Sequence, residues 1–543
     1  MVPRWGSRWR TWTANLIYLL PLVFLALFFF YPLFMIFGLS LAPEGRLDLS
    51  PFGALFRQPY YGRLLAFTTG QALLSTLLTL LVGMPAAFAF ARYDFPGKSL
   101  LRALTTIPFV LPTMVVAAAF TALLGPGGYL NSWLMTAFGL DRAPIQLQHT
   151  LALVLIAHVF YNAAIMVRLV GGFWANLDPR VEEAARVLGA GRWRTFREVT
   201  LPLLLPSIIA ASLLVFLFCF TSFGVILILG GPQLATIETE IYYQAVSLFN
   251  LPLAAALTIT QLLFTFAIMA VYTRLQARAA VPLNLRPREA TQRRPAGPGQ
   301  QLVVWGSVGG LLALLLAPLV ALVDRSFSLG GTYTLRYYHA LLTNPQQSFF
   351  YVPPAVAIRN SLLVAGAAVI LALALGLIAA YLLTRRAGRL ESLLDPVFML
   401  PLGASAVTLG FGYVIALDQP PLDLRASPLL LPLAHALVAF PFVVRSLLPA
   451  LRGMKPQWRE AAGVLGATPS RVLREIDLPI VARALLVAAV FAFTVSVGEF
   501  GATLLIARPD FPTMPVVIYR LLGAQGALNH GQGLAMSTLL MVV

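Results

Sequence analysis

The chain has 543 residues, of which 59% are hydrophobic and only 11% are charged, with a mean hydropathy of +0.82. A soluble globular domain carries about 25% charged residues, so this composition excludes one and predicts an all-α polytopic membrane protein surrounded by lipid. The formal net charge of +17 would suggest nucleic-acid binding in a soluble protein, but in a membrane protein it marks cytoplasmic loops. We therefore expect a lipid bilayer and no nucleic acid.

Twelve apolar stretches are predicted as spans, each of which needs about 20 residues to cross a bilayer. The first is too long for the apolar region of a signal peptide and is followed by no cleavage site, so it is expected to be retained. The last stops at Val543, short of a full span, and we expect part of that helix to be missing. With a cytoplasmic N-terminus, most of the 38 Lys and Arg residues fall in inner loops, as the positive-inside rule requires. The spans are predicted at residues 14–40, 64–91, 100–124, 150–172, 206–230, 251–273, 301–323, 360–384, 393–417, 427–450, 484–506 and 528–543.

The sequence is internally duplicated. Residues 183–189 read EAARVLG and recur 277 residues later as EAAGVLG at 460–466, and the same offset relates His158 to His435. Nearer the start of each half the offset is 293. Because each half contains an even number of spans, six, both halves enter the membrane in the same direction.

Three segments follow from this duplication. The first six-span half is predicted at 1–275 and the second at 301–543. Between them, residues 276–300 are rich in proline, glycine and arginine, a composition that is typical of a solvated linker on the cytoplasmic side.

Each copy of the repeated segment lies in a predicted cytoplasmic loop between the fourth and fifth spans of its half. In the first copy, Asp178 and Pro179 are residues typical of a helix start, and the apolar residues that follow recur at helical spacing. We predict a short helix parallel to the membrane that fits a groove of another protein. The alternative is a surface helix that lies on lipid headgroups.

These two loops resemble the signature loop of the integral-membrane permeases of binding-protein-dependent ABC importers. The pattern is Glu-Ala-Ala, three residues, Gly, nine residues, Ile or Val, one residue and Leu-Pro, and both copies keep this spacing. In that family the loop forms the coupling helix, which docks in a cleft of the cytoplasmic ATPase and transmits its closure. The resemblance implies this role for Glu183, Ala184, Ala185, Gly189, Pro202, Glu460, Ala461, Ala462, Gly466 and Pro479.

The fused arrangement resembles the permeases of the ferric-iron and thiamine importers. Residues 221–244 are similar to the thiamine branch, whereas residues 496–504 are similar to the broader iron, molybdate and sulfate branch. The resemblance therefore implies ferric iron or thiamine as the substrate and leaves the choice open. It also implies a multi-pass protein of a bacterial or archaeal plasma membrane, partnered by a cytoplasmic ABC ATPase dimer and an extracytoplasmic substrate-binding protein.

No catalytic, cofactor or metal site is predicted. The nearest match to a nucleotide-binding loop ends in Gly97-Lys98-Ser99, but Arg92 stands where the first glycine is needed. ATP hydrolysis is thus expected in a separate subunit. His158 and His435 are related by the repeat, which favours hydrogen bonds between helices over metal binding.

Three polar residues within predicted spans are candidates for the translocation path: Glu499, its repeat equivalent Ser222, and Asn162. A charged carboxylate inside a bilayer costs about 3 kcal/mol or more without a partner. Glu499 is therefore expected either to contact a cationic or polar substrate or to be hydrogen-bonded within the helix bundle. The alternative function is an ion-coupled secondary transporter or channel without an ATPase; the scarcity of intramembrane charges and the two docking loops argue against it.

Overall fold

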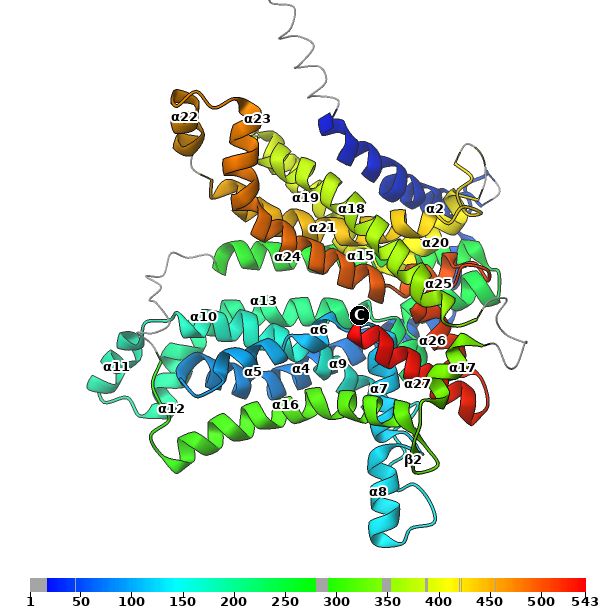
Figure 1. Ribbon diagram of the computed structural model, residues 1–543, viewed down its shortest axis with the longest axis horizontal. Coiled ribbons are helices and arrows are strands. Elements are labelled where there is room, and N and C mark those ends of the chain that lie inside the picture. The colour runs from blue at the N-terminus through cyan, green and yellow to red at the C-terminus, as the bar shows by residue number, and fades with distance from the viewer. Residues whose placement is uncertain are drawn as a thin grey trace, which may run out of the picture. The chain divides into compact units, whose positions relative to one another are not determined.

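The computed structural model describes residues 17–43, 45–279, 292–343, 353–385, 389–418, 420, 422–454 and 456–543 (Figure 1). Among these residues, ten helices are long and apolar enough to cross a membrane, and one bent pair of helices adds an eleventh. The all-α polytopic class is thereby confirmed. Residues 280–291 of the predicted linker lie outside the described part of the chain.

The helices follow the predicted spans closely in most places. In the first half of the sequence they are η1 (Ala26–Phe30), α2 (Tyr31–Leu41), α4 (Pro59–Arg92), α7 (Thr113–Leu124), α9 (Leu151–Ile165), η2 (Met166–Val170), α10 (Gly171–Ala175), α13 (Leu201–Phe220) and α15 (Leu251–Ala279). In the second half they are α16 (Pro298–Phe327), α18 (Val356–Arg385), α19 (Arg389–Gly403), α20 (Ala406–Ala416), α21 (Leu430–Arg452), α24 (Leu478–Gly498), α26 (Met514–Gly523) and α27 (Ala527–Val542). The described strands are β1 (Ser328–Leu329) and β2 (Thr332–Tyr333), which pair antiparallel.

Several predicted spans differ from single full-length helices. The third span is broken in both halves: α5 (Lys98–Leu104), α6 (Ile107–Val110) and α7 replace one helix in the first, and α19 meets α20 at 93° in the second. Proline lacks an amide donor and interrupts helices, and Pro112 stands immediately before α7. The last stretch forms α27, whose 16 residues fall short of the length of a candidate span.

A further helix, α8 (Tyr129–Phe138), lies where the sequence predicts an outer loop. It is bounded by Gly128 and Gly139, and Gly139 has the left-handed backbone (φ 61°) that closes many helices.

The described chain forms two compact units, and each draws on both halves of the sequence. Unit one comprises Met1–Phe52, Ile241–Ile259 and Ala340–Val517; unit two comprises Gly53–Glu240, Thr260–His339 and Ile518–Val543. In unit one α2 packs against α20, and in unit two α16 packs against α4 and α7. The first span of each half therefore packs on helices of the opposite half, an arrangement that the repeat does not reveal.

Close helix packing recurs at repeat-related positions. In unit two, a Cβ added to Gly83 on α4 would lie 2.7 Å from the Cβ of Met166; in unit one, a Cβ added to Gly376 on α18 would lie 2.4 Å from Val443 Cγ1. The sequence offsets of 293 and 277 relate Gly83 to Gly376 and Met166 to Val443. Small residues let membrane helices approach closely, so both units keep the same tight contact.

Replacing Gly376 with alanine should destabilise the protein, because Val443 is β-branched and stiff and cannot move aside cheaply. Overpacking of this kind costs about 1–3 kcal/mol. The matched control is Gly366→Ala on the same helix, where an added Cβ meets nothing within 4 Å. Thermal unfolding in detergent measures both variants, and equal unfolding temperatures would show that the close contact is absent.

Candidate functional site

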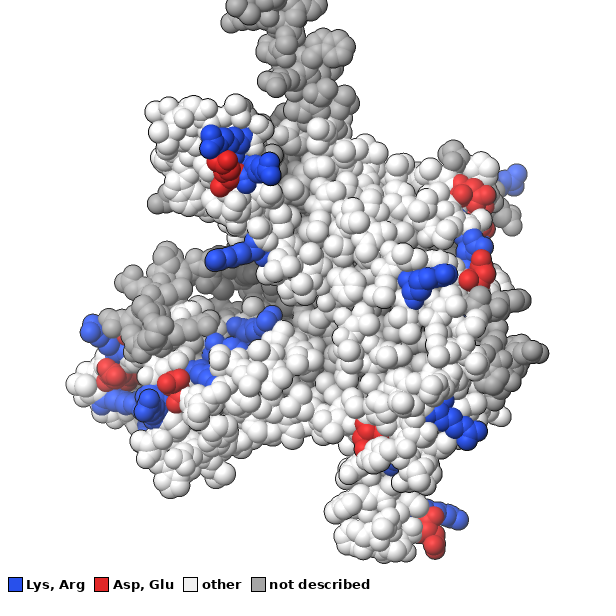
Figure 2. Space-filling model, viewed as in Figure 1, with Lys and Arg blue, Asp and Glu red and all other residues white. Residues whose placement is uncertain are grey.

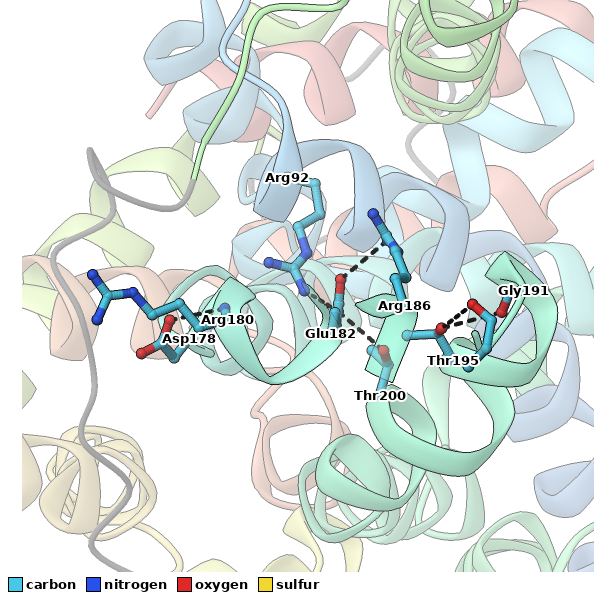
Figure 3. Close-up of polar contacts among 9 residues, drawn as sticks. Arg92, Asp178, Arg180, Glu182, Arg186, Gly191, Thr195 and Thr200 are labelled. Atoms are coloured by element: carbon cyan, nitrogen blue, oxygen red, sulfur yellow. Dashed lines mark hydrogen bonds and ion pairs between the residues drawn. The ribbon is translucent and has the colours of Figure 1, made fainter. Parts of the chain in front are cut away.

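The short helix predicted in the first loop is present as α11 (Pro179–Val187) (Figure 3). Its N-cap residue, Asp178, accepts a hydrogen bond from the backbone amide of Arg180 at 3.0 Å, and Pro179 occupies the first turn. The helix ends before Gly189, whose φ of 86° is accessible mainly to glycine. A second short helix, α12 (Arg192–Thr195), follows directly.

The second loop has the same local architecture. Helix α22 (Pro456–Val464) is followed by Gly466, with φ 80°, and then by α23 (Pro469–Val472). Pro202 and Pro479 occupy the first turns of α13 and α24, the spans that follow the two loops.

Both loop helices present apolar side chains to solvent at their C-terminal ends. Val187 and Leu188 are 86% and 87% exposed, and their repeat equivalents Val464 and Leu465 are 88% and 87% exposed. Of the signature residues, Glu183, Ala184, Glu460 and Ala461 are exposed, whereas Ala185 and Ala462 are half-buried. Single exposed apolar residues are ordinary, but the same pair at the end of two duplicated helices is what a docking surface requires.

Charged side chains surround these loops. On the face shown in Figure 2, Arg, Asp and Glu side chains gather around α11 and α12 in unit two and around α22 and α23 in unit one, whereas the long helices are largely uncharged. Two exposed ion pairs recur at repeat positions: Arg194–Glu198 in the first loop and Arg471–Glu475 in the second, each at 3.0 Å.

The first loop is tied to the helix bundle by an apolar and a polar contact. Phe196 packs against a buried cluster that includes Trp174 and Leu204. Glu182 binds the guanidinium of Arg92 at the end of α4 and accepts a hydrogen bond from Thr200 Oγ1 at 3.0 Å (Figure 3). The sequence analysis named Arg92 only as a departure from a nucleotide-binding loop and did not predict its contact with Glu182 or that of Thr200, because none of the three belongs to the signature pattern.

Glu499 lies at the break between α24 and α25 (Gly501–Ile506) and is 7% exposed. Its carboxylate accepts hydrogen bonds from the amides of Ala502 and Thr503 at 2.8 and 2.9 Å and from the Thr503 hydroxyl. His435 Nε2 lies 3.3 Å from Glu499 Oε2, and His435 Nδ1 lies 2.8 Å from Ser496 Oγ. Of the two expectations for Glu499, this geometry matches the hydrogen-bonded contact between helices.

The repeat-related cluster in unit two centres on His158. Its ring nitrogens lie 2.8 Å from Ser75 Oγ and 2.9 Å from Ser222 Oγ. Asn162 donates to the backbone carbonyl of His158 and lies 3.5 Å from Cys219 Sγ. Ser222 and Asn162, both path candidates, therefore lie in one buried hydrogen-bonded group, and the expected helix–helix hydrogen bonds of the two histidines are present. Within the described ranges, no three His, Cys, Asp or Glu side chains are grouped to hold a metal ion.

Two further buried carboxylates were missed by the sequence analysis. Glu238 and Glu240 lie on α14 (Ile237–Tyr242) and are 0% and 6% exposed. Tyr60 donates a hydrogen bond to Glu240 at 2.7 Å, and the side-chain amide of Gln261 donates to Glu238. They escaped notice because α14 lies between predicted spans.

Comparison with known proteins identifies the class. Residues 79–281 match the family described as binding-protein-dependent transport system inner membrane component. Together with the relatives that match over most of the chain, this domain supports a fused two-domain membrane permease of an ABC importer. The resemblance based on the two signature loops is confirmed.

Relatives that match along most of both chains include thiamine permeases. The thiamine transport system permease protein ThiP of Brucella abortus (strain 2308) is 29% identical over 487 residues, covering 86% of this chain and 83% of the relative. ThiP of Escherichia coli (strain K12) is 28% identical over 483 residues, covering 87% and 85%. A chain of the bacterial ABC transporter involved in alginate import is similar over 51% of this chain and 99% of its own, with 19% identity and a TM-score of 0.42.

Proposed function

We propose that this permease imports thiamine, which an extracytoplasmic binding protein delivers and which crosses the membrane at the expense of ATP hydrolysed by a cytoplasmic ATPase dimer. The substrate is suggested by the thiamine permeases that match most of both chains. Of the two substrates that the sequence left open, we favour thiamine over ferric iron for this reason.

The observation that carries the ATPase partnership is the duplicated loop helix with its exposed apolar end. Each ATPase subunit receives one loop: α11 with Glu183, Ala184, Ala185 and Gly189, or α22 with Glu460, Ala461, Ala462 and Gly466. An amphipathic helix binds a groove through its apolar anchors. The anchors here are Val187 with Leu188 and Val464 with Leu465, which are almost fully exposed.

The proposal includes an orientation and a domain organisation. The N-terminus and both loops face the cytoplasm of a bacterial or archaeal cell, as the positive-inside rule favours. Residues 1–275 and 301–543 are the two duplicated permease domains, joined by the linker at 276–300.

Uptake by the reconstituted complex tests this function. Proteoliposomes that contain the permease, its ATPase and its binding protein should accumulate labelled thiamine only when ATP is supplied on the ATPase side. Liposomes without the ATPase serve as the control, and ferric iron serves as the competing substrate. Uptake driven by an ion gradient without ATP would contradict the importer mechanism, and uptake of iron instead of thiamine would contradict the substrate.

A further inference from the structure

In both units, a side chain on the loop helix is hydrogen-bonded to a side chain at the start of the next span. The two contacts lie at repeat-related positions but are made by different residue types. The offset of 277 relates Glu182 to Arg459 and Thr200 to Asp477. In unit two, Thr200 Oγ1 donates to Glu182 at 3.0 Å; in unit one, Arg459 Nε donates to Asp477 Oδ1 at 2.8 Å. The geometry is repeated although all four residue types differ and the sign of charge on the loop helix is reversed.

In unit two this contact is one of two polar attachments that Glu182 makes between α11 and the helix bundle. None of the residues of α11 is buried, so the helix has little packing of its own to fix its position. Glu182, with 14% of its side chain exposed, also binds Arg92, which is 8% exposed, and lies 3.7 Å from Arg186 (Figure 3). One carboxylate thus joins α11 to the end of α4 and to the start of α13.

In unit one the corresponding ion pair lies beside an apolar cavity. Arg459 and Asp477 border a cavity of about 370 Å³ whose other lining residues, among them Leu377, Leu451 and Val481, are mostly apolar. The Asp477 side chain is 16% exposed. Partial burial in apolar surroundings strengthens a charged hydrogen bond, so this pair can hold α22 against the start of α24.

We propose that the pairs Glu182–Thr200 and Arg459–Asp477 are positioning latches, which make each loop helix move as one body with the span that follows it. The inference rests on the proposed function, because docking of the ATPase supplies the movement that the latches transmit. Without a latch, the loop helix still binds the ATPase through its exposed apolar end, but its displacement no longer reaches the span. Loss of the latch therefore uncouples ATP hydrolysis from transport without preventing assembly.

The latch in unit two is tested by giving Glu182 and Thr200 the residue types of their repeat equivalents, Arg459 and Asp477. Glu182→Arg places a third positive charge beside Arg92 and Arg186 and leaves Thr200 without its acceptor. Because breaking a partly buried charge pair is strongly unfavourable, uptake should fall by about tenfold or more while ATPase binding and hydrolysis persist. Adding Thr200→Asp gives unit two the residue types of Arg385, Arg459 and Asp477 at the corresponding positions. This double variant should recover uptake to within about twofold of the original protein, as a re-formed pair predicts.

The reciprocal exchange and a matched charge reversal complete the design. Arg459→Glu should uncouple unit one in the same way, and Asp477→Thr should rescue it. Asp94→Arg reverses an exposed charge in the loop after α4, outside both docking loops, where surface charges contribute little, and should leave uptake unchanged.

The outcomes separate the latch from the proposed function. If Glu182→Arg transports as well as the Asp94→Arg control, or if the double variant transports no better than Glu182→Arg alone, the latch is refuted. If Glu182→Arg fails to fold, Glu182→Ala, which removes the acceptor of Thr200 Oγ1, replaces it as the uncoupled variant, and the rescue by the double variant is judged against it. Failure of the unaltered complex to take up thiamine contradicts the substrate only, because the ratio of ATP hydrolysed to substrate transported can be measured with whichever substrate is moved.

Discussion

Replacing Val187 and Leu188 together with serine should remove most of the affinity of the permease for its ATPase. The two side chains are 86% and 87% exposed in the isolated chain, so they have little role in folding the permease itself. Burying a valine or leucine side chain in a groove contributes about 1.5–3 kcal/mol. Since each 1.4 kcal/mol corresponds to about a tenfold change in affinity, the double substitution should weaken binding by about 100-fold or more.

Co-purification of the ATPase with the permease measures this effect. The corresponding substitutions at Val464 and Leu465 should weaken binding similarly, because the two loops carry the same apolar pair at repeat positions. Phe138→Ser is the matched control: this side chain is also exposed, at 68%, but lies on α8. Full retention of the ATPase by the variant with both pairs replaced would rule out the apolar ends as the docking surface.

Replacing Glu499 with alanine should be among the most destabilising single changes in the chain. The carboxylate accepts the amide hydrogens of Ala502 and Thr503 at the start of α25 and lies beside His435. Each buried donor that loses its acceptor costs about 1–3 kcal/mol, and no water is available inside a bilayer to replace the carboxylate. We expect a loss of about 3 kcal/mol or more in the free energy of unfolding.

Thermal unfolding in detergent, compared with Ser222→Ala, checks this expectation. Ser222 stands at the repeat position of Glu499 and contributes one hydrogen bond to His158, so its removal should cost about 1 kcal/mol. A Glu499→Ala protein that unfolds like the original but no longer transports would instead assign the carboxylate to the substrate path.

The sequence predicted those features whose signal is local. Long apolar runs located the spans, and the helix-start residues Asp178 and Pro179, with Gly189, predicted the loop helix. The breaks within the third spans were missed because hydropathy averages over a window and does not register a proline such as Pro112. The bonds of Glu499 depend on the break between α24 and α25, so its partners could not be assigned from an apolar run.

Contacts between residues far apart in the chain could not be predicted from the sequence. The repeat offset relates Glu182 to Arg459 and Thr200 to Asp477. A comparison that looks for identical residues misses these positions, because the contact is kept while the residue types differ. The packing of α2 on α20 is similarly invisible, since duplication predicts equivalent elements and not which copy each one contacts.

The packing of α2 on α20 determines when, during synthesis, the first helix can reach its final position. Helix α2 is near the start of the chain, yet its partner α20 ends at Ala416. During synthesis from the N-terminus, α2 is therefore inserted into the membrane before its packing partner exists, and the two helices can pack only after the ribosome has passed Ala416. Neither half of the polypeptide holds all the packing partners of its own first helix, so the packing of α2 is completed only after α20, in the second half of the chain, has been inserted.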